Sequence, residues 1–213
     1  MFEYQISEKV EFILNNELLD LLNQRRSIYA PGKNLTVDDD AIVKLAEDAI
    51  QASPTAFNSQ TVRAVFLFGD KHDQLWDIVA KRLKSEVPTE AAYENTLRKI
   101  NSFKAGYGTI LYLTDMAVVH QLENDFPLYA DNFATWAEQG QGIAQNNVWV
   151  SLANNKIGAS LQHYNPIIDE LVADAFDLPS NWMLRAQMPF GSIEGPAGEK
   201  DYMDRNQQFK VLK

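Results

Sequence analysis

The sequence predicts a layered domain of the α+β or α/β class, and three observations favour this class. Amphipathic helical patterns alternate along the chain with short apolar segments rich in β-branched residues. Strands that are separated by helices cannot pair as simple hairpins, so we expect them to form one sheet that helices cover. The chain has 213 residues, which is close to the size of one domain. We therefore expect a single domain over residues 1–213.

The first half of the chain is expected to contain four helices and one strand. Apolar side chains recur there at a spacing close to 3.6 residues, the period of an amphipathic helix. Thr36 is the expected N-cap of the second helix, and Pro54 ends that helix because it disfavours helical geometry at Ser53. The β-branched, apolar run TVRAVFLF indicates a buried strand. The expected elements are helices over 9–24, 36–52, 71–85 and 89–103 and a strand over 61–68.

The second half is expected to contain a strand, a long helix, a short helix and a final strand. Gly140 and Gly142 lie inside the long helix, where each costs about 1 kcal/mol relative to alanine. Such glycines indicate the close approach of another backbone or of a ligand. Asn165 and Pro166 are expected to open the short helix as its cap and first residue. The expected elements are strands over 109–114 and 182–190 and helices over 131–156 and 166–176, while the polar segment 85–105 is a candidate excursion over the functional site.

Composition and charge argue against several classes of function. The chain has 29 acidic and 19 basic residues and a net charge of −10, which disfavours nucleic acid and anionic membrane surfaces as partners. It has no cysteine, which excludes thiolate nucleophiles, CxxC redox chemistry and cysteine zinc sites. No uncharged apolar run is long enough to span a membrane, and the acidic first residues do not resemble a secretory signal. We therefore expect a cytoplasmic protein.

Motifs for metal or nucleotide chemistry are not found in the sequence. The three histidines, His72, His120 and His163, do not pair at helical spacing and no HExxH motif occurs, so no metal is expected. His72 and His120 are expected on the solvated surface. The sequence also has no GxSxG elbow, Walker A motif or GxGxxG fingerprint. No side-chain nucleophile is therefore assigned.

The segment Arg25-Arg26-Ser27 is the first candidate for binding chemistry. Two guanidinium groups and a hydroxyl at the end of a helix can clamp an anion, because guanidinium meets phosphate in a bidentate manner. A cation also suits the C-terminus of a helix without binding anything. The two interpretations are equally open from these residues alone.

Two further segments are candidates for contacts with a heterocycle. The polar segment 53–60 joins a helix to a strand, and its Asn58 and Gln60 offer both donors and acceptors. Residues 159–166 form an apolar-to-polar strand end followed by a helix start, which is a common geometry for the edge of a site. His163 lies there, although a lone histidine more often packs or caps than catalyses. The alternative for residues 53–60 is an ordinary capped connection.

Taken together and in this order, these segments resemble the FMN-dependent nitroreductase family. The resemblance is to its short branch, often labelled "nitroreductase-like" or "fatty acid repression mutant protein", and it covers about residues 25–200. It implies an α+β sandwich, with a central and largely antiparallel sheet flanked by helices, and an interlocked homodimer with two FMN molecules at its interface. Ile143 and Trp149 lie off the main apolar stripe of helix 131–156, which also favours a partner subunit. The matching segments are RRSIYAPGKN, SPTAFNSQTVRAVFLFG, NNVWVSLANNKIGASLQHYNP and MPFGSIEGPAGEK.

The resemblance also implies roles for individual residues. The arginine pair, the serine and a late lysine would hold the FMN phosphate and ribityl chain. The amides of the 53–60 segment would reach the ribityl or ring atoms from the other subunit, and residues 160–164 would lie along the isoalloxazine with backbone N–H groups near its reactive edge. Tyr29 stands where many relatives carry a second basic residue. The implied cofactor-binding residues are Arg25, Arg26, Ser27, Asn58, Gln60, Gln162, His163, Tyr164 and Lys200.

The reaction that the resemblance implies is the reduction of a flat, electron-poor acceptor, such as a nitroaromatic or a quinone, in a ping-pong sequence. Non-covalent FMN would take hydride at N5 from NAD(P)H as a transient co-substrate, so the protein need not supply a nucleophile. Phe57, Trp136 and Tyr164 are candidates for stacking on the acceptor. One alternative is an FMN-binding regulatory or stress-response protein with incidental turnover. Another is an acidic interaction module without a cofactor.

Overall fold

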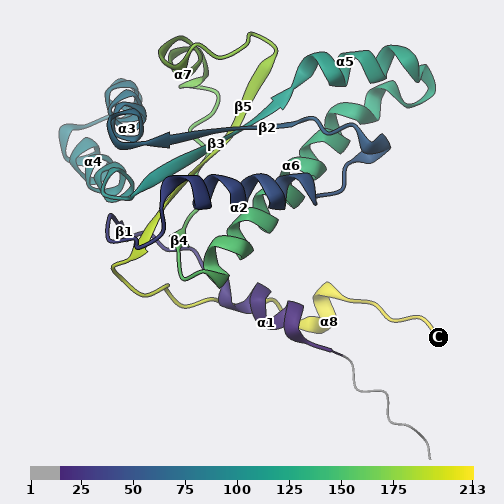
Figure 1. The fold of residues 1–213 in the computed structure, drawn as a ribbon, viewed down its shortest axis with the longest axis horizontal. Coiled ribbons are helices and arrows are strands. Elements are labelled where there is room, and N and C mark those ends of the chain that lie inside the picture. Colours follow the sequence, from purple (N-terminus) through teal and green to yellow (C-terminus); the bar gives the residue numbers. More distant parts are fainter. Residues whose placement is uncertain (1–14) are drawn as a thin grey trace, which may run out of the picture.

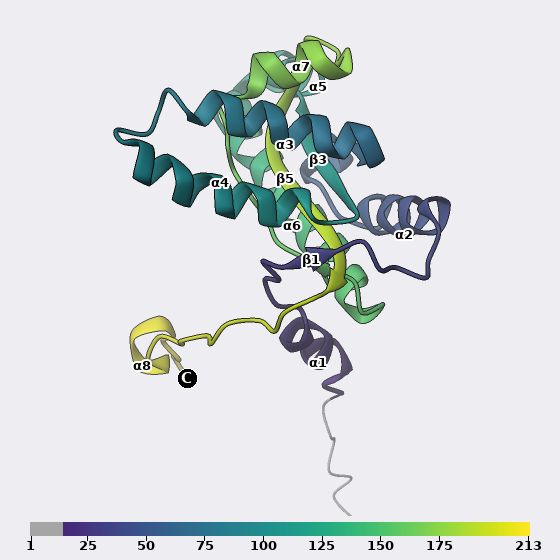
Figure 2. The same cartoon turned by 90° about the vertical axis from the view of Figure 1, so that its left-hand side faces the viewer.

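The computed structural model describes residues 15–213, and its core is a five-stranded antiparallel sheet covered by helices on both faces (Figure 1). The strand order is β1-β5-β3-β2, and β4 also pairs with β5. In Figure 2, α3 and α4 lie in front of the sheet, while α2 and α6 lie behind it. This arrangement confirms the α+β sandwich with a central antiparallel sheet.

The expected helices and strands occur in the expected order with shifted ends, but helices over 116–125 and 205–208 and a short strand over 31–32 were not expected. The helices are α1 (Glu17–Gln24), α2 (Asp39–Gln51), α3 (Gly69–Leu83), α4 (Glu90–Lys104), α5 (Met116–Asp125), α6 (Ala130–Asn154), α7 (Asp169–Phe176) and α8 (Arg205–Gln208), with 3-10 turns η1 (Ala56–Asn58) and η2 (Pro127–Tyr129). The strands are β1 (Pro31–Gly32), β2 (Val62–Phe68), β3 (Gly108–Asp115), β4 (Gly158–Ala159) and β5 (Trp182–Ile193). Residues 9–14 of the expected first helix lie outside the described residues.

Two helix starts differ from the expectation, for reasons visible in the hydrogen bonds. Asp38, and not Thr36, caps α2, because its carboxylate accepts from the Ala41 amide at 2.8 Å. The expected cap at Asn165 is also wrong, because α7 begins only at Asp169. The Asn165 amide donates instead to the Leu184 carbonyl at 2.8 Å and to the Asp169 carboxylate at 3.0 Å.

The central strand β3 divides the core between the two faces of the sheet. All eight of its residues are buried, and they pair with β2 on one side and β5 on the other. Successive side chains point to opposite faces, so Ile110 and Tyr112 face α2 and α6 while Leu111 and Leu113 face α3 and α7. A bulge at Arg185 of β5 shifts the register between these pairs.

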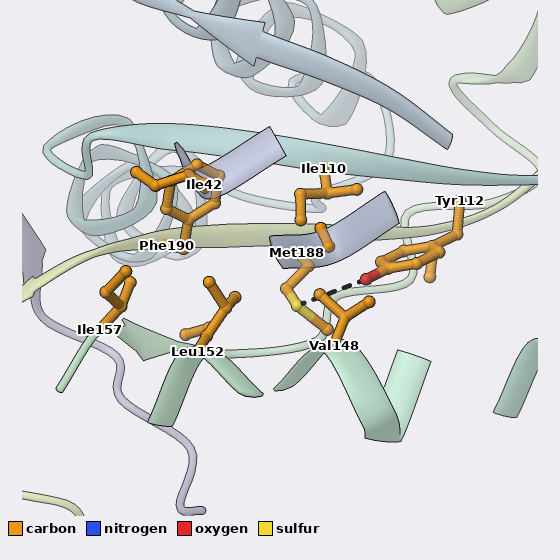
Figure 3. Close-up of a cluster of buried hydrophobic side chains, with 11 residues drawn as sticks. Ile42, Ile110, Tyr112, Val148, Leu152, Ile157, Met188 and Phe190 are labelled. Carbon is orange, nitrogen blue, oxygen red and sulfur yellow. Dashed lines mark hydrogen bonds between the residues drawn. The ribbon is translucent and has the colours of Figure 1, made fainter. Parts of the chain in front are cut away.

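The core between the sheet and the helices α2 and α6 is apolar (Figure 3). Val148 and Leu152 from α6 and Ile42 from α2 belong there to one buried cluster with Met188 and Phe190 of β5. The Tyr112 hydroxyl contacts the Met188 sulfur at 3.8 Å, and burial raises the pKa of this tyrosine far above its usual value. This face holds the long helix along which the candidate site residues lie.

The core under α3, α4 and α7 contains a buried histidine. His72 is fully buried, so its expected place on the surface is wrong, whereas His120 is exposed as expected. Its ring nitrogens lie 2.9 Å from the Thr109 hydroxyl and 3.1 Å from the Lys104 carbonyl, and Trp76 donates to the same hydroxyl at 3.0 Å. The residue shares a helix face with apolar neighbours three, four and seven positions later, which is a burial pattern.

The polar segment 85–105 does not cover the candidate site. It forms mainly α4, which packs on α3 on the face of the sheet opposite to α2 and α6 (Figure 2). The chain after β5 leaves the sheet instead and extends away from it to α8 (Figure 2). Its apolar side chains are exposed, namely Tyr202, Met203, Phe209, Val211 and Leu212.

Two further properties concern the described residues alone. Among residues 15–213 no helix is long and apolar enough to cross a membrane. The same part of the chain contains no group of three or more histidine or carboxylate side chains suited to a metal ion.

Candidate functional site

A cavity of about 310 Å³ brings together the arginine pair and the segment that follows β5. Arg25, Arg26 and Ser27 line one side of it and Lys200 lines the other. The Arg26 guanidinium donates to the Gly198 carbonyl, which holds the late segment against the end of α1. The structure therefore assembles the four residues to which the resemblance gives a phosphate role.

The charges of this cavity suit an anion. Arg25 lies over the Trp149 ring, with its guanidinium carbon 4.4 Å from the ring centroid. Burial, together with the neighbouring charge of Arg26, lowers the pKa of Arg25 from its usual value. The N–H donors of a guanidinium lie in the plane of the group. When the group stacks on an aromatic ring, these donors therefore point outward from the edges of the guanidinium and stay free to bind a ligand. Three cations and one carboxylate, that of Glu199, thus line this cavity, which leaves it a net positive charge in a chain whose net charge is −10.

The strand segment 158–163 lies between the arginine segment and β5. On one edge, Gly158 and Ala159 pair with β5. On the other edge, Ser27 bridges Ala159, and the Ile28 amide donates to the Ala159 carbonyl at 2.9 Å. The cavity lined by Arg25, Arg26 and Ser27 therefore adjoins the segment 158–163.

The backbone of residues 160–164 offers donors on that same edge. The amides of Ser160 and Gln162 donate to carbonyls of β5, at 3.2 and 2.8 Å. Backbone alternation turns the N–H groups of Leu161 and His163 the opposite way, toward the edge that Ser27 occupies. These two N–H groups can donate to a ligand that lies beside Ser27.

The side chains of this segment point in different directions. Gln162 is buried, and its amide donates to the Ser160 hydroxyl at 3.1 Å. Tyr164 packs edge-on against Trp76, with 6.0 Å between ring centroids, and burial raises its pKa to about 12. The side chain of His163 is exposed. The surface beside Ser27 is therefore formed by main chain more than by these side chains.

The amides of the 53–60 segment line a different cavity, of about 390 Å³. Asn58 and Gln60 are exposed there beside Thr55 and Arg63. Three non-glycine residues of this loop have a left-handed backbone, with φ of 57° at Phe57, 50° at Asn58 and 48° at Gln60. Backbone conformations of this kind often mark functional loops.

An aromatic cluster borders this loop. The Phe57 ring is 51% exposed and lies 4.9 Å from Phe126 and 5.4 Å from Phe133 between centroids. It stacks on Trp136 at 5.9 Å with 20° between ring planes, and Tyr129 lies 6.3 Å away. Sequence reasoning singled out Phe57 and Trp136 but missed Phe126 and Tyr129. The available signal was their spacing in the sequence, which is typical of one helix face. Phe126 lies seven residues before Phe133, and Tyr129 lies seven residues before Trp136.

The two cavities lie at different heights on α6. Thr55 packs against Gly140, where a Cβ would come within 3.2 Å of it, whereas Arg25 stacks on Trp149. Nine residues of helix separate these contacts, a rise of about 13 Å. The expected close approach of another backbone is not found at either glycine, because the neighbour of Gly140 is the Thr55 side chain and no described residue lies within 4 Å of a Cβ at Gly142. The two sets of candidate residues therefore line two separate cavities of one chain.

Comparisons with known proteins show which family the chain resembles. The family model described as "Nitroreductase family" matches residues 22–192. Two proteins of Saccharomyces cerevisiae are similar over most of their length. HBN1 is 36% identical and the nitroreductase FRM2 is 32% identical, each over 87% of this chain and over 92% and 93% of their own.

Solved structures show the same fold. The nitroreductase CinD of Lactococcus lactis, solved with nicotinic acid, is 51% identical with a TM-score of 0.85, over 92% of this chain and 100% of its own. Other CinD structures contain chloramphenicol or 4-nitrophenol. A protein of Desulfovibrio desulfuricans solved in complex with FMN shares the fold at 20% identity, with a TM-score of 0.66 over 94% of this chain and 99% of its own.

Proposed function

The chain belongs to the nitroreductase family, and from that premise we propose that it is an FMN-dependent oxidoreductase. Its reductant would be NAD(P)H, and its acceptors would be flat, electron-poor aromatics such as nitroaromatics or quinones. The observation that carries the proposal is the single cavity in which Arg25, Arg26, Ser27 and Lys200 meet beside a strand edge with outward N–H groups.

The residues present fit FMN better than a neutral ligand. Guanidinium and ammonium groups with a serine hydroxyl form a donor set for a phosphate dianion. The N–H groups of Leu161 and His163 lie farther along the same edge, where the ring system would reach. There they would donate to acceptor atoms of the isoalloxazine and fix its orientation. The chemistry that FMN supplies when bound is the transfer of a hydride equivalent from NAD(P)H to an acceptor.

The two separate cavities support a homodimer in which the two subunits share each cofactor. Asn58 and Gln60 line a cavity of their own, so a second copy of the chain could bring them against the Arg25 cavity of its partner. Ile143 is 39% exposed on α6, and the segment after β5 exposes several apolar side chains. Burying such surface is the usual reason for stable association.

The aromatic cluster supports the choice of acceptor. Phe57 immediately precedes Asn58, and its exposed ring lies against Trp136. A flat acceptor can stack on such rings, an interaction worth about 0.5–1.5 kcal/mol beyond the area it buries. Tyr164, also considered for this role, lies against Trp76 instead.

The visible spectrum of the freshly purified protein tests the proposal. We expect a yellow protein that releases FMN on denaturation and oxidises NADH or NADPH when a quinone or nitroaromatic is present. Released FAD, or no flavin after supplementation with FMN, would contradict the proposal. FMN binding without turnover would identify the regulatory alternative.

A further inference from the structure

We propose that Arg63, paired with Asp115, is a positioning residue that holds loop 55–60 in its binding conformation and thereby completes the cofactor site of the partner subunit. The inference rests on the proposed function, because it takes this loop as one half of the FMN site. It adds a residue to which neither the sequence motifs nor the comparisons give a role.

The backbone of the loop requires a restraint. Phe57, Asn58 and Gln60 all have φ near +50°. A residue with a Cβ disfavours this region, and such a conformation persists only where the surroundings impose it. The loop that carries both candidate amides would otherwise relax to a more common conformation.

Arg63 binds the main chain of the loop directly. One terminal nitrogen of its guanidinium, Nη1, donates to the Gln60 carbonyl at 2.7 Å and to the Val62 carbonyl at 3.0 Å. The Gln60 amide in turn donates to the Thr55 hydroxyl at 3.0 Å. Gln60 is therefore held at its N–H by the loop itself and at its C=O by Arg63.

The other end of the guanidinium is anchored to the sheet. Its Nη2 lies 2.8 Å from an Asp115 oxygen, and the Asp115 side chain is only 11% exposed. That carboxylate also accepts from Asn181 at 2.6 Å and from the Ala117 amide at 3.1 Å. Burial raises the pKa of Asp115, but the bonds from Asn181 and Ala117 and the Arg63 charge outweigh it and lower the pKa overall. The charged anchor thus belongs to the rigid end of β3.

The placement of Arg63 distinguishes it from an ordinary structural ion pair. Its side chain lines the same cavity as Asn58 and Gln60. The backbone of Arg63, on the edge strand β2, pairs with Leu113 of the central strand β3, and a changed side chain leaves that pairing in place. Removing the guanidinium should consequently release the loop without opening the core.

Substitution of Arg63 with a matched control tests the inference through FMN affinity. Arg82 on α3 is the control, because its side chain is 31% exposed against 30% for Arg63 and it also forms an ion pair, with Glu86 just beyond the end of that helix. We expect Arg63→Met to weaken FMN binding about tenfold, equivalent to about 1.4 kcal/mol, while Arg82→Met changes it little. Arg63→Lys should fall between, since an ammonium keeps the charge but lacks the planar fork.

Hydrogen exchange in the FMN-free protein separates positioning from a general loss of stability. In Arg63→Met, the amides of Asn58 and Gln60 should exchange faster, while those of β3 keep their wild-type protection. A uniform loss of protection through β3, in step with the loss of FMN affinity, would overturn the inference. If Arg63→Met does not fold, Arg63→Lys provides the same comparison.

A mixed dimer tests whether the Arg63–Asp115 pair, here called the clamp, acts on the FMN site of the partner subunit. Arg26→Ala impairs the phosphate half of a subunit's own site, and Arg63→Met impairs the loop that the subunit lends. A dimer of one chain of each kind should therefore contain one wild-type site and one doubly impaired site. Two weak sites would overturn the placement in trans.

The outcomes separate this inference from the proposed function. If wild-type protein binds no FMN, the proposed function fails, and unchanged exchange at Asn58 and Gln60 would remove the clamp as well. If wild-type protein binds FMN and a folded Arg63→Met binds it equally well, only the clamp is overturned.

Discussion

The two faces of the sheet differ in how far the side chains on them are buried and bonded within one copy of the chain. Under α3, α4 and α7 the core is closed, and even the polar atoms of His72 and Thr109 find partners there. On the side of α2 and α6 the apolar core is equally dense, but its margin is open. It carries exposed Ile143, the exposed Phe57 ring and the cavities lined by Asn58 and by Arg25. The first face contributes mainly to the stability of the fold, and we propose that a ligand and a second subunit complete the other.

The largest effect is expected in the closed face. Trp76 is fully buried and bonded to Thr109, so Trp76→Ala should lower the free energy of unfolding by about 3–5 kcal/mol. Tyr129→Ala, in the open aromatic cluster, should cost much less because its ring is 43% exposed. Urea unfolding of both variants measures the difference. Equal losses would show that the two faces are not distinct.

The next effect concerns the open face and binding. If Arg26 bonds the phosphate, Arg26→Ala should lose roughly 1.5–3 kcal/mol of FMN affinity, or about 10- to 150-fold. Riboflavin, which has no phosphate, should be affected much less. A mutant that loses both equally would indicate misfolding, and one that loses neither would return Arg26 to its role at the helix end. Arg25 is the second candidate, and fluorescence titration of both variants decides between them.

A smaller effect is expected for the aromatic cluster. Phe57→Ala should raise the KM for a nitroaromatic or quinone about three- to tenfold, since one aromatic contact is worth about 0.5–1.5 kcal/mol. FMN affinity should stay unchanged. Leu128→Ala is the matched control, because Leu128 lies between the cluster residues Phe126 and Tyr129 in the sequence and is 84% exposed. An unchanged KM in Phe57→Ala would exclude stacking of the acceptor on this ring.

The smallest effect is a pH dependence of the free energy of unfolding, which arises from His72 in the closed face. Burial lowers the pKa of His72 below 6.5, although the bond to the Lys104 carbonyl and the charge of Asp73 oppose this in part. Below pH 6.5 the unfolded chain binds a proton more readily than the folded one, so stability should fall as the pH drops toward the folded pKa. Above pH 6.5 His72 is neutral in both the folded and the unfolded chain, so its protonation no longer lowers the stability. Urea unfolding between about pH 5.5 and 7.5 should show the slope in wild type and His120→Asn, and lose most of it in His72→Asn.

Periodicity predicted most of the helices and strands because each pattern is local, although it missed α5. His72 shows the limit of that reasoning. Its sequence neighbours are polar, but its own face of α3 continues with Leu75, Trp76 and Val79. The sheet and its buried partner Thr109 decide the environment of this histidine, and that partner is distant in sequence. Asn165 was misassigned for the same reason, since its amide bonds across to Leu184.

The candidate site could be predicted only in part. The short motifs identified Arg25, Ser27 and Lys200, and the structure places them around one cavity. The roles of the outward N–H groups could not be assigned residue by residue, because they depend on which edge of a strand is already paired. Arg63 was also missed, since nothing near it in the sequence indicates that its guanidinium joins a loop to Asp115.

The position of Lys200 after β5 determines which parts of its cavity are made last during synthesis. A growing chain emerges from its N-terminus, so the arginine segment and β3 are available long before β5 and the residues that follow it. Until β5 is made, the centre of the sheet keeps an unpaired edge, and the cavity lacks Gly198 and Lys200. A fragment that ends before β5 therefore has neither the closed sheet nor the lysine side of this cavity.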